Sequence, residues 1–224
     1  LESWKHTKHL ARLAANYVSG RAIDHFGRYE EDFDLAKKLH LNTLRFNVEW
    51  SRVEPTEGNW NAEAIDHYKQ YVAGLQKRGL EPVLTLFHFT LPVWFSDMGG
   101  FEKLSNIQYF VRFAEKIMSE LGGSVRYIIT INEPERYAFE SYYKGHWPPA
   151  SISFWRAVKV YKNLAVAHKR VYAKLHAMRR TYKIGYAKHS VYMYPGDDAW
   201  LTRTSAGIGQ WLYDDYWIRK TIKH

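Results

Sequence analysis

The sequence predicts an α/β fold in which about four parallel strands with covering helices form part of a (β/α)8 TIM barrel. Short apolar segments alternate with longer amphipathic ones, which is typical of strand–helix units around a parallel sheet. Candidate functional residues lie at the ends of three successive strands, at Arg45–Trp50, His88 and Glu133, as in barrel enzymes. A complete barrel takes ~250 residues, so four strands are too few to close one.

Apolar runs and alternation of apolar with polar residues define the strands. In the first, Leu44, Phe46 and Val48 alternate with polar residues, whereas the second and third are nearly continuous apolar runs, which is typical of buried parallel strands. The predicted strands are Asn42–Trp50, Glu81–Phe89, Val125–Ile131 and Lys183–His189.

Helical periodicity fills the segments between these strands. Asn61 and Ser105 are predicted N-caps, glycines follow two of the helices, and Leu39 is expected on the inward face of the first helix. The predicted helices are near Tyr29–Leu39, from Asn61 to Gly79, from Ser105 to Gly122-Gly123, Ser153–Arg179, and a last stretch to about Ile222.

We interpret residues 1–224 as a single domain, part of one TIM barrel, with an irregular N-terminal segment at 1–18. Because an open barrel would leave unpaired strand edges and an exposed apolar face, we expect missing barrel segments or a complementary fragment as a partner. The chain has no cysteine and no signal peptide pattern, which suggests a cytoplasmic location.

The composition excludes some classes of function. No apolar run approaches the ~20 residues of a membrane helix, and we find no metal-binding motif, so neither a membrane role nor a cofactor is expected. The net charge is −1 over residues 1–155 and +10 over residues 156–224. A basic region could bind nucleic acid, but without a supporting motif we interpret it as a solvated helix face or a surface that meets acidic segments.

Glu133 is the candidate catalytic acid. It follows an apolar strand in Ile129-Thr130-Ile131-Asn132-Glu133-Pro134, where a strand end and a proline would hold its carboxyl group in place. An acid that protonates a glycosidic oxygen needs a raised pKa, obtained by partial burial and a nearby second carboxylate. Asn132 could hydrogen-bond a sugar hydroxyl beside the reacting carbon. The alternative is an ordinary glutamate in an exposed loop.

Two further residues are candidates for substrate binding. Arg45 lies within a strand and, if it points into a barrel, needs a carboxylate partner; otherwise it points outward between helices. His88 ends the second strand, where it could donate to a sugar hydroxyl or serve only as a structural histidine. The loops at Trp50–Pro55 and Gly145–Pro149 could form an acceptor-sugar wall or serve packing alone.

These residues resemble glycoside hydrolase family 1, the β-glucosidase type. The resemblance runs from about Ser19 to His224 and weakens after Tyr192. The Asn-Glu-Pro triplet alone is shared by related barrel glycosidases, and Trp50-Ser51-Arg52 with Pro55 makes the resemblance specific to the family. The matching segments are Ser19–Ala22, Asp24-His25, Arg28–Asp32, Arg45–Pro55, Thr85–Phe89 and Thr130–Pro134.

The resemblance implies a (β/α)8 barrel, of which this sequence covers roughly the second to fifth βα units, and a retaining β-glycosidase acting on a small carbohydrate substrate, a terminal β-linked sugar. It implies that Glu133 is the general acid/base, that Asn132 holds the 2-hydroxyl group, that His88 binds the sugar, and that Arg45 lies near the nucleophile. No cofactor or metal is implied.

The sequence departs from the family pattern at several places, the most important of which is the second carboxylate. The family's nucleophile is a glutamate in a Thr-Glu-Asn-Gly stretch, and no glutamate follows Glu140 in this sequence. The family's first-strand Gln-x-Glu-Gly segment and its late sugar-gripping loop are also absent, and Phe89-Thr90 replaces the commoner Trp-Asp. The alternative is therefore a catalytically inactive half-barrel that binds sugar or assembles with a complementary fragment. The sugar, the aglycone and the oligomeric state do not follow from these residues.

Overall fold

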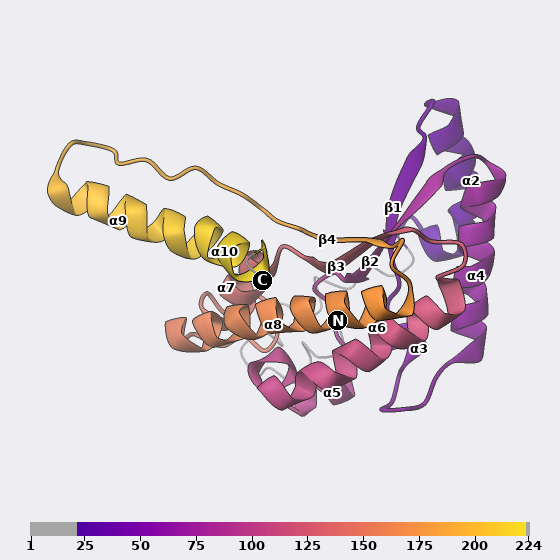
Figure 1. Ribbon diagram of the computed structural model, residues 1–224, viewed down its shortest axis with the longest axis horizontal. Helices are drawn as coiled ribbons and strands as arrows, with labels where there is room; N and C mark the ends of the chain where they lie inside the picture. Colours follow the sequence, from indigo (N-terminus) through magenta and orange to yellow (C-terminus); the bar gives the residue numbers. More distant parts are fainter. Residues whose placement is uncertain (1–21, 223–224) are drawn as a thin grey trace.

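The computed structural model describes residues 22–222, so the predicted irregular segment 1–18 and the matching residues 19–21 lie outside the described residues. Four parallel strands pair in chain order, as Figure 1 shows, and confirm the predicted sheet. They are β1 Thr43–Asn47, β2 Glu81–Phe87, β3 Tyr127–Asn132 and β4 Lys183–Ala187.

Helices precede, separate and follow these strands. The predicted cap Asn61 is present, because its side chain accepts a hydrogen bond from the Ala64 N–H. Ser153, which was not predicted as a cap, accepts one from the Arg156 N–H at the start of the long helix. The helices are α2 His25–Lys38, α3 Trp50–Val53, α4 Ala62–Lys77, α5 Val93–Asp97, α6 Ile107–Leu121, α7 Pro134–Tyr142, α8 Phe154–Met178, α9 Trp200–Gln210 and α10 Tyr216–Ile222, with the short turns η3 Gly100–Glu102, η4 Leu104–Asn106 and the π-helical η5 Trp211–Asp215.

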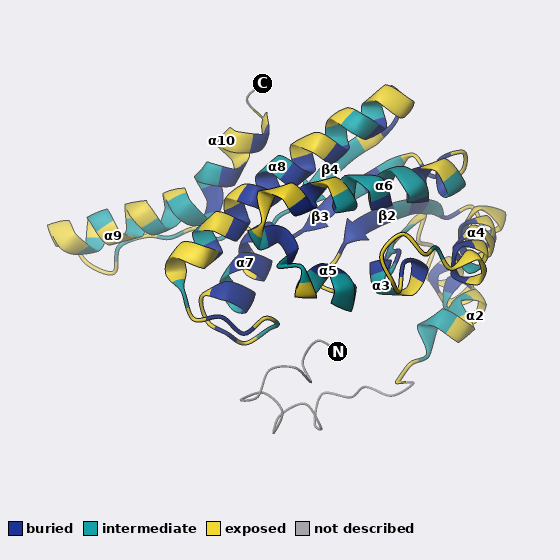
Figure 2. Ribbon diagram, turned by 90° about the horizontal axis from the view of Figure 1, so that it is seen from below, coloured by how far each residue is buried: buried dark blue, intermediate teal, exposed yellow. Residues whose placement is uncertain are grey.

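The strand register separates the sheet into a covered face and an open face. Phe46, Leu84 and Ile128 lie side by side across β1, β2 and β3, and all three are buried. Phe46 contacts Tyr71 of α4, so this row faces the helices, which lie over the dark blue strands in Figure 2. Side chains alternate along a strand, so the neighbouring rows, which include Arg45, face the other way.

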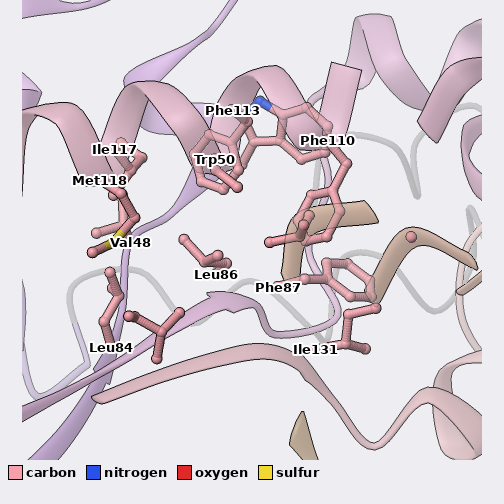
Figure 3. Packing of buried hydrophobic residues seen from close by; sticks show 14 of the residues in the cluster. Val48, Trp50, Leu84, Leu86, Phe87, Phe110, Phe113, Ile117, Met118 and Ile131 are labelled. Atoms are coloured by element: carbon pink, nitrogen blue, oxygen red, sulfur yellow. The ribbon is translucent and has the colours of Figure 1, made fainter. Parts of the chain in front are cut away.

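The core lies between the sheet and α6. Trp50 is almost fully buried and stacks on Phe113, with 4.8 Å between ring centroids. Phe110 and Phe113 from α6 lie above Leu86 of β2 in Figure 3. Burying large aromatic side chains is strongly favourable, so this cluster holds β2 in place and thereby the strand ends that follow it.

Several sequence predictions about local structure were wrong. Trp50 is not in a strand or an open loop. It is the first residue of α3, and its indole packs into the core. Ser105 does not cap α6, which begins after Asn106 without a side-chain cap. Leu39 is 72% exposed, because α2 ends at Lys38 and Leu39 is its C-cap. The helix α7, directly after Glu133, was not predicted.

After β4 the chain leaves the body of the molecule. An extended connection runs outward and α9 returns, as Figure 1 shows, so that α9 projects past α7 and α8. No residue of α9 is buried, whereas Trp217 of α10 is fully buried. Within residues 22–222, no helix combines the length and the apolar character that crossing a bilayer requires.

Candidate functional site

Glu133 stands at the junction between β3 and α7. Its backbone is in the left-handed region, with φ 40° and ψ 64°, and it is the N-cap residue of α7. Its N–H donates to the Ala187 carbonyl of β4 at 2.7 Å, and its carbonyl accepts from the Tyr137 N–H at 3.1 Å. Left-handed conformations are unfavourable for residues with a Cβ, so the surrounding structure fixes this backbone.

The Glu133 side chain reaches the surface only in part. It is 27% exposed, and its Oε2 lies 3.9 Å from the guanidinium of Arg136, one turn further along α7. Pro134 follows as the first residue of the helix, where its fixed φ is compatible and its missing N–H is not needed. The carboxylate is therefore held at the rim of the sheet, beyond the carboxyl end of β3.

Arg45 lies on the open face of the sheet. Its Nε donates to Thr85 Oγ1 at 2.8 Å, and its Nη2 donates to Asn132 Oδ1 at 2.6 Å. These contacts cross from β1 over β2 to β3, so Arg45 does not point outward between helices. Loss of hydration lowers the pKa of Arg45, and the negative charge of Glu133 opposes this effect. Arg45, Asn132 and Glu133 thus form one group.

His88 follows β2 and belongs to the same edge of the sheet. Loss of hydration and then the charge of Arg45 lower its pKa, while Glu133 and Glu49 raise it. Lowering keeps the imidazole neutral at pH 7. The next ring, Phe89, contacts Trp147 with centroids 4.7 Å apart, and the Arg136 guanidinium lies 5.9 Å from the Trp147 ring. The Trp147 ring therefore lies between the Phe89 ring and the cation beside Glu133, in contact with both.

The two loops that could form an acceptor-sugar wall or serve packing alone have different outcomes. Trp147, from the Gly145–Pro149 segment, lies in the group just described. Trp50 is buried in the core, and its Nε1 donates to Glu54 Oε2 at 2.7 Å, so its ring is not available to a ligand.

Glu135 is the residue near the site that sequence reasoning missed. It lies in the first turn of α7, its side chain is fully buried, and burial raises its pKa to about 7. The signal was present, because a proline followed by an acidic residue is typical of the first turn of a helix. No group of three or more His, Asp or Glu side chains within residues 22–222 is arranged to hold a metal ion.

This chain belongs to glycosyl hydrolase family 1, whose family model matches residues 2–221. It is 29% identical over 197 residues to beta-glucosidase A of Acetivibrio thermocellus, which covers 87% of this chain and 44% of that protein. It is 30% identical over 209 residues to a 6-phospho-beta-galactosidase of Clostridium acetobutylicum, covering 92% of this chain and 44% of that protein.

The solved structures agree with this family. A beta-glycosidase from Pyrococcus horikoshii superimposes with a TM-score of 0.87 at 32% identity, covering 96% of this chain and 49% of that one. The four strands and their helices are thus part of a (β/α)8 barrel, as predicted. The chain spans a little under half the length of these two curated relatives.

The backbone of Glu133 can be tested through stability. Asparagine tolerates the left-handed region better than alanine does, so Glu133→Asn should have a free energy of unfolding about 1 kcal/mol higher than Glu133→Ala. Urea unfolding would measure both. At exposed Glu63, in the first turn of α4, the order should reverse because alanine is the better helix former. The same order at both positions would show that position 133 is not strained.

The buried carboxyl group of Glu135 predicts a pH dependence. Between pH 4.5 and about 7 the unfolded chain ionises Glu135 while the folded protein keeps it protonated, so stability should fall as pH rises. At about 1.4 kcal/mol per pKa unit the loss is roughly 3 kcal/mol. Glu135→Gln should remove most of this slope in urea unfolding at pH 4.5 and pH 7.5, and exposed Glu63→Gln should not. An unchanged slope in Glu135→Gln would contradict the assignment.

Proposed function

We propose that the full-length protein is a retaining β-glycosidase of the β-glucoside type, with Glu133 as its general acid/base. The observation that carries the proposal is the backbone of Glu133, held in a left-handed conformation at the end of a barrel strand, with Arg45 hydrogen-bonded to the preceding Asn132. Unfavourable backbone conformations that persist at a strand end are commonly functional. Membership in glycosyl hydrolase family 1 supports this class of reaction.

The contacts of the residues around Glu133 suggest how each of them would bind a sugar. Asn132 is 3% exposed and its Oδ1 accepts from Arg45, so its amide N–H groups are the donors for a 2-hydroxyl group. His88, neutral at pH 7, can donate to another hydroxyl. Phe89 and Trp147 offer apolar ring faces beside them. A sugar ring presents both hydroxyl groups and C–H faces, which fits this combination.

A retaining mechanism also needs a nucleophile. The second carboxyl group must lie ~5–5.5 Å from the first, and no glutamate follows Glu140 in the 224 residues. A segment beyond these residues would supply it, beside Arg45, whose guanidinium bonds only neutral oxygens among the hydrogen bonds found here. No particular sugar is assigned, because a beta-glucosidase and a 6-phospho-beta-galactosidase are similarly related to this chain.

The second candidate function is a catalytically inactive half-barrel that binds sugar or assembles with a complementary fragment. The open face of the sheet favours it, because Arg45 and its neighbours lack a covering layer among the described residues. The intact mass of the protein isolated from its source separates the two. A mass well above 26.5 kDa favours the enzyme, whereas a mass of 26.5 kDa favours the half-barrel.

Glu133→Gln in the full-length protein should slow hydrolysis of a substrate with a poor leaving group by ~10²-fold or more, the scale of general acid catalysis. An activated aryl glycoside needs little protonation, so its glycosylation step should slow much less. Pre-steady-state and steady-state rates with both substrates would measure this difference. Glu63→Gln, at an exposed glutamate in the first turn of α4, is the matched control and should leave both rates unchanged. Near-wild-type rates on both substrates would rule out the role of Glu133.

A protein of these 224 residues alone should not hydrolyse glycosides by the two-carboxylate route, because Glu133 has no glutamate partner later in the chain. The test is a fluorosugar inactivator followed by mass spectrometry of a purified chain of confirmed 26.5 kDa mass. We expect no covalent adduct. Labelling of Asp197, Asp198, Asp214 or Asp215 would refute this expectation.

A further inference from the structure

Three ionisable side chains meet behind the first turn of α7, away from the proposed sugar-binding group. Glu135 of α7 is 0% exposed, Lys188 after β4 is 7% exposed, and Asp214 of η5 is 6% exposed. Charges buried without partners are costly, and the proposed reaction uses none of the three. We call these residues the buried charge cluster.

Lys188 is the centre of the cluster. Its Nζ lies 2.5 Å from Asp214 Oδ1 and 3.9 Å from Glu135 Oε2, and it donates to the Tyr213 carbonyl at 2.7 Å. Asp214 Oδ2 accepts from the Val191 N–H at 3.1 Å. One cation thus joins η5, the segment after β4 and the start of α7.

The cluster reaches the backbone on which Glu133 stands. Glu135 Oε1 accepts from the His189 N–H at 2.6 Å, and the Glu133 N–H donates to the Ala187 carbonyl at 2.7 Å. Two hydrogen bonds therefore hold the start of α7 against the end of β4. They join residues 133 and 135 of one segment to residues 187 and 189 of the other. Lys188 lies between Ala187 and His189 in sequence, and its ammonium group faces the Glu135 carboxyl group at the second point.

We propose that Lys188 is a positioning residue for Glu133: by pairing with Glu135 and Asp214 it holds the first turn of α7 against the end of β4. The inference rests on the proposed function of Glu133 as acid/base. Without the cation, the Asp214 carboxylate would be buried without its ion-pair partner beside the Glu135 carboxyl group, and the turn would move toward water. Displacing a reacting group by about 1 Å can cost ~10²-fold in rate.

The same cluster places a charge near the acid. The charged and titratable groups around Glu135 are Glu133 and Arg136 from α7, Lys188 and His189 after β4, Tyr213 and Asp214 from η5, and Tyr161 from α8. Burial raises the pKa of Glu135 to about 7, hydrogen bonds and Lys188 oppose this, and Glu133 adds to it. A negative charge on Glu135 therefore repels one on Glu133.

The test compares Lys188→Met with Lys174→Met in the full-length protein. Lys174 also forms an ion pair, with Glu115 at 2.7 Å, but it lies on α8 outside the cluster. Lys188→Met should lower kcat for a poor leaving group about tenfold or more, with a smaller loss for an activated aryl glycoside and KM within about threefold. Lys174→Met should stay within about twofold on both substrates. Equal behaviour of the two folded variants would overturn the proposal.

Glu135→Gln decides the question if Lys188→Met does not fold, as judged by circular dichroism. It keeps an acceptor for the His189 N–H but removes the charge, so the alkaline limb of the pH–rate profile should move to lower pH. A role in stability alone would leave that limb in place, and an unmoved limb would then overturn the proposal. If Glu133→Gln shows no dependence on the leaving group, the proposed function fails instead of the positioning role.

Discussion

One backbone hydrogen bond, from the Glu133 N–H to the Ala187 carbonyl, connects the parts of this structure on which the proposed function depends. It closes the pairing of β3 and β4 where β3 ends, and the left-handed conformation of Glu133 then turns the chain directly into α7. Because a strand becomes a helix within one residue, the carboxylate has little freedom to shift. The backbone of Glu133 is therefore positioned by β3 on one side and α7 on the other, without an intervening loop.

The register of the sheet explains why the polar group assembles on one side. Parallel strands bring their carboxyl ends to the same edge, and the row that includes Phe46 faces the helices. Arg45, one residue away, must then face the open side. Its hydrogen bonds go to the hydroxyl oxygen of Thr85 and the amide oxygen of Asn132. Neutral acceptors satisfy the guanidinium geometry without cancelling its charge, which agrees with a carboxylate supplied from elsewhere.

The sequence predicts those parts of the fold and site that depend on local signals. The Asn61 cap and the strand that ends before Glu133 follow from periodicity and residue type. Trp50 was misplaced because its burial depends on Phe113, far along the chain, and not on its neighbours. Glu135 was missed because hydrophobic periodicity after Pro134 is short, and only tertiary packing shows that its carboxyl group is buried.

The helix α9 is less stabilised by packing than the other helices among the described residues. No residue of α9 is buried, although Trp200, Leu201 and Ile208 present large apolar side chains on it. α9 continues without a break through η5 into α10, and because it buries no residue of its own it gains little stability from packing. The amide protons of α9 should therefore exchange with solvent far faster than those of α6 or β3, and slow exchange in α9 would reveal that something packs against it.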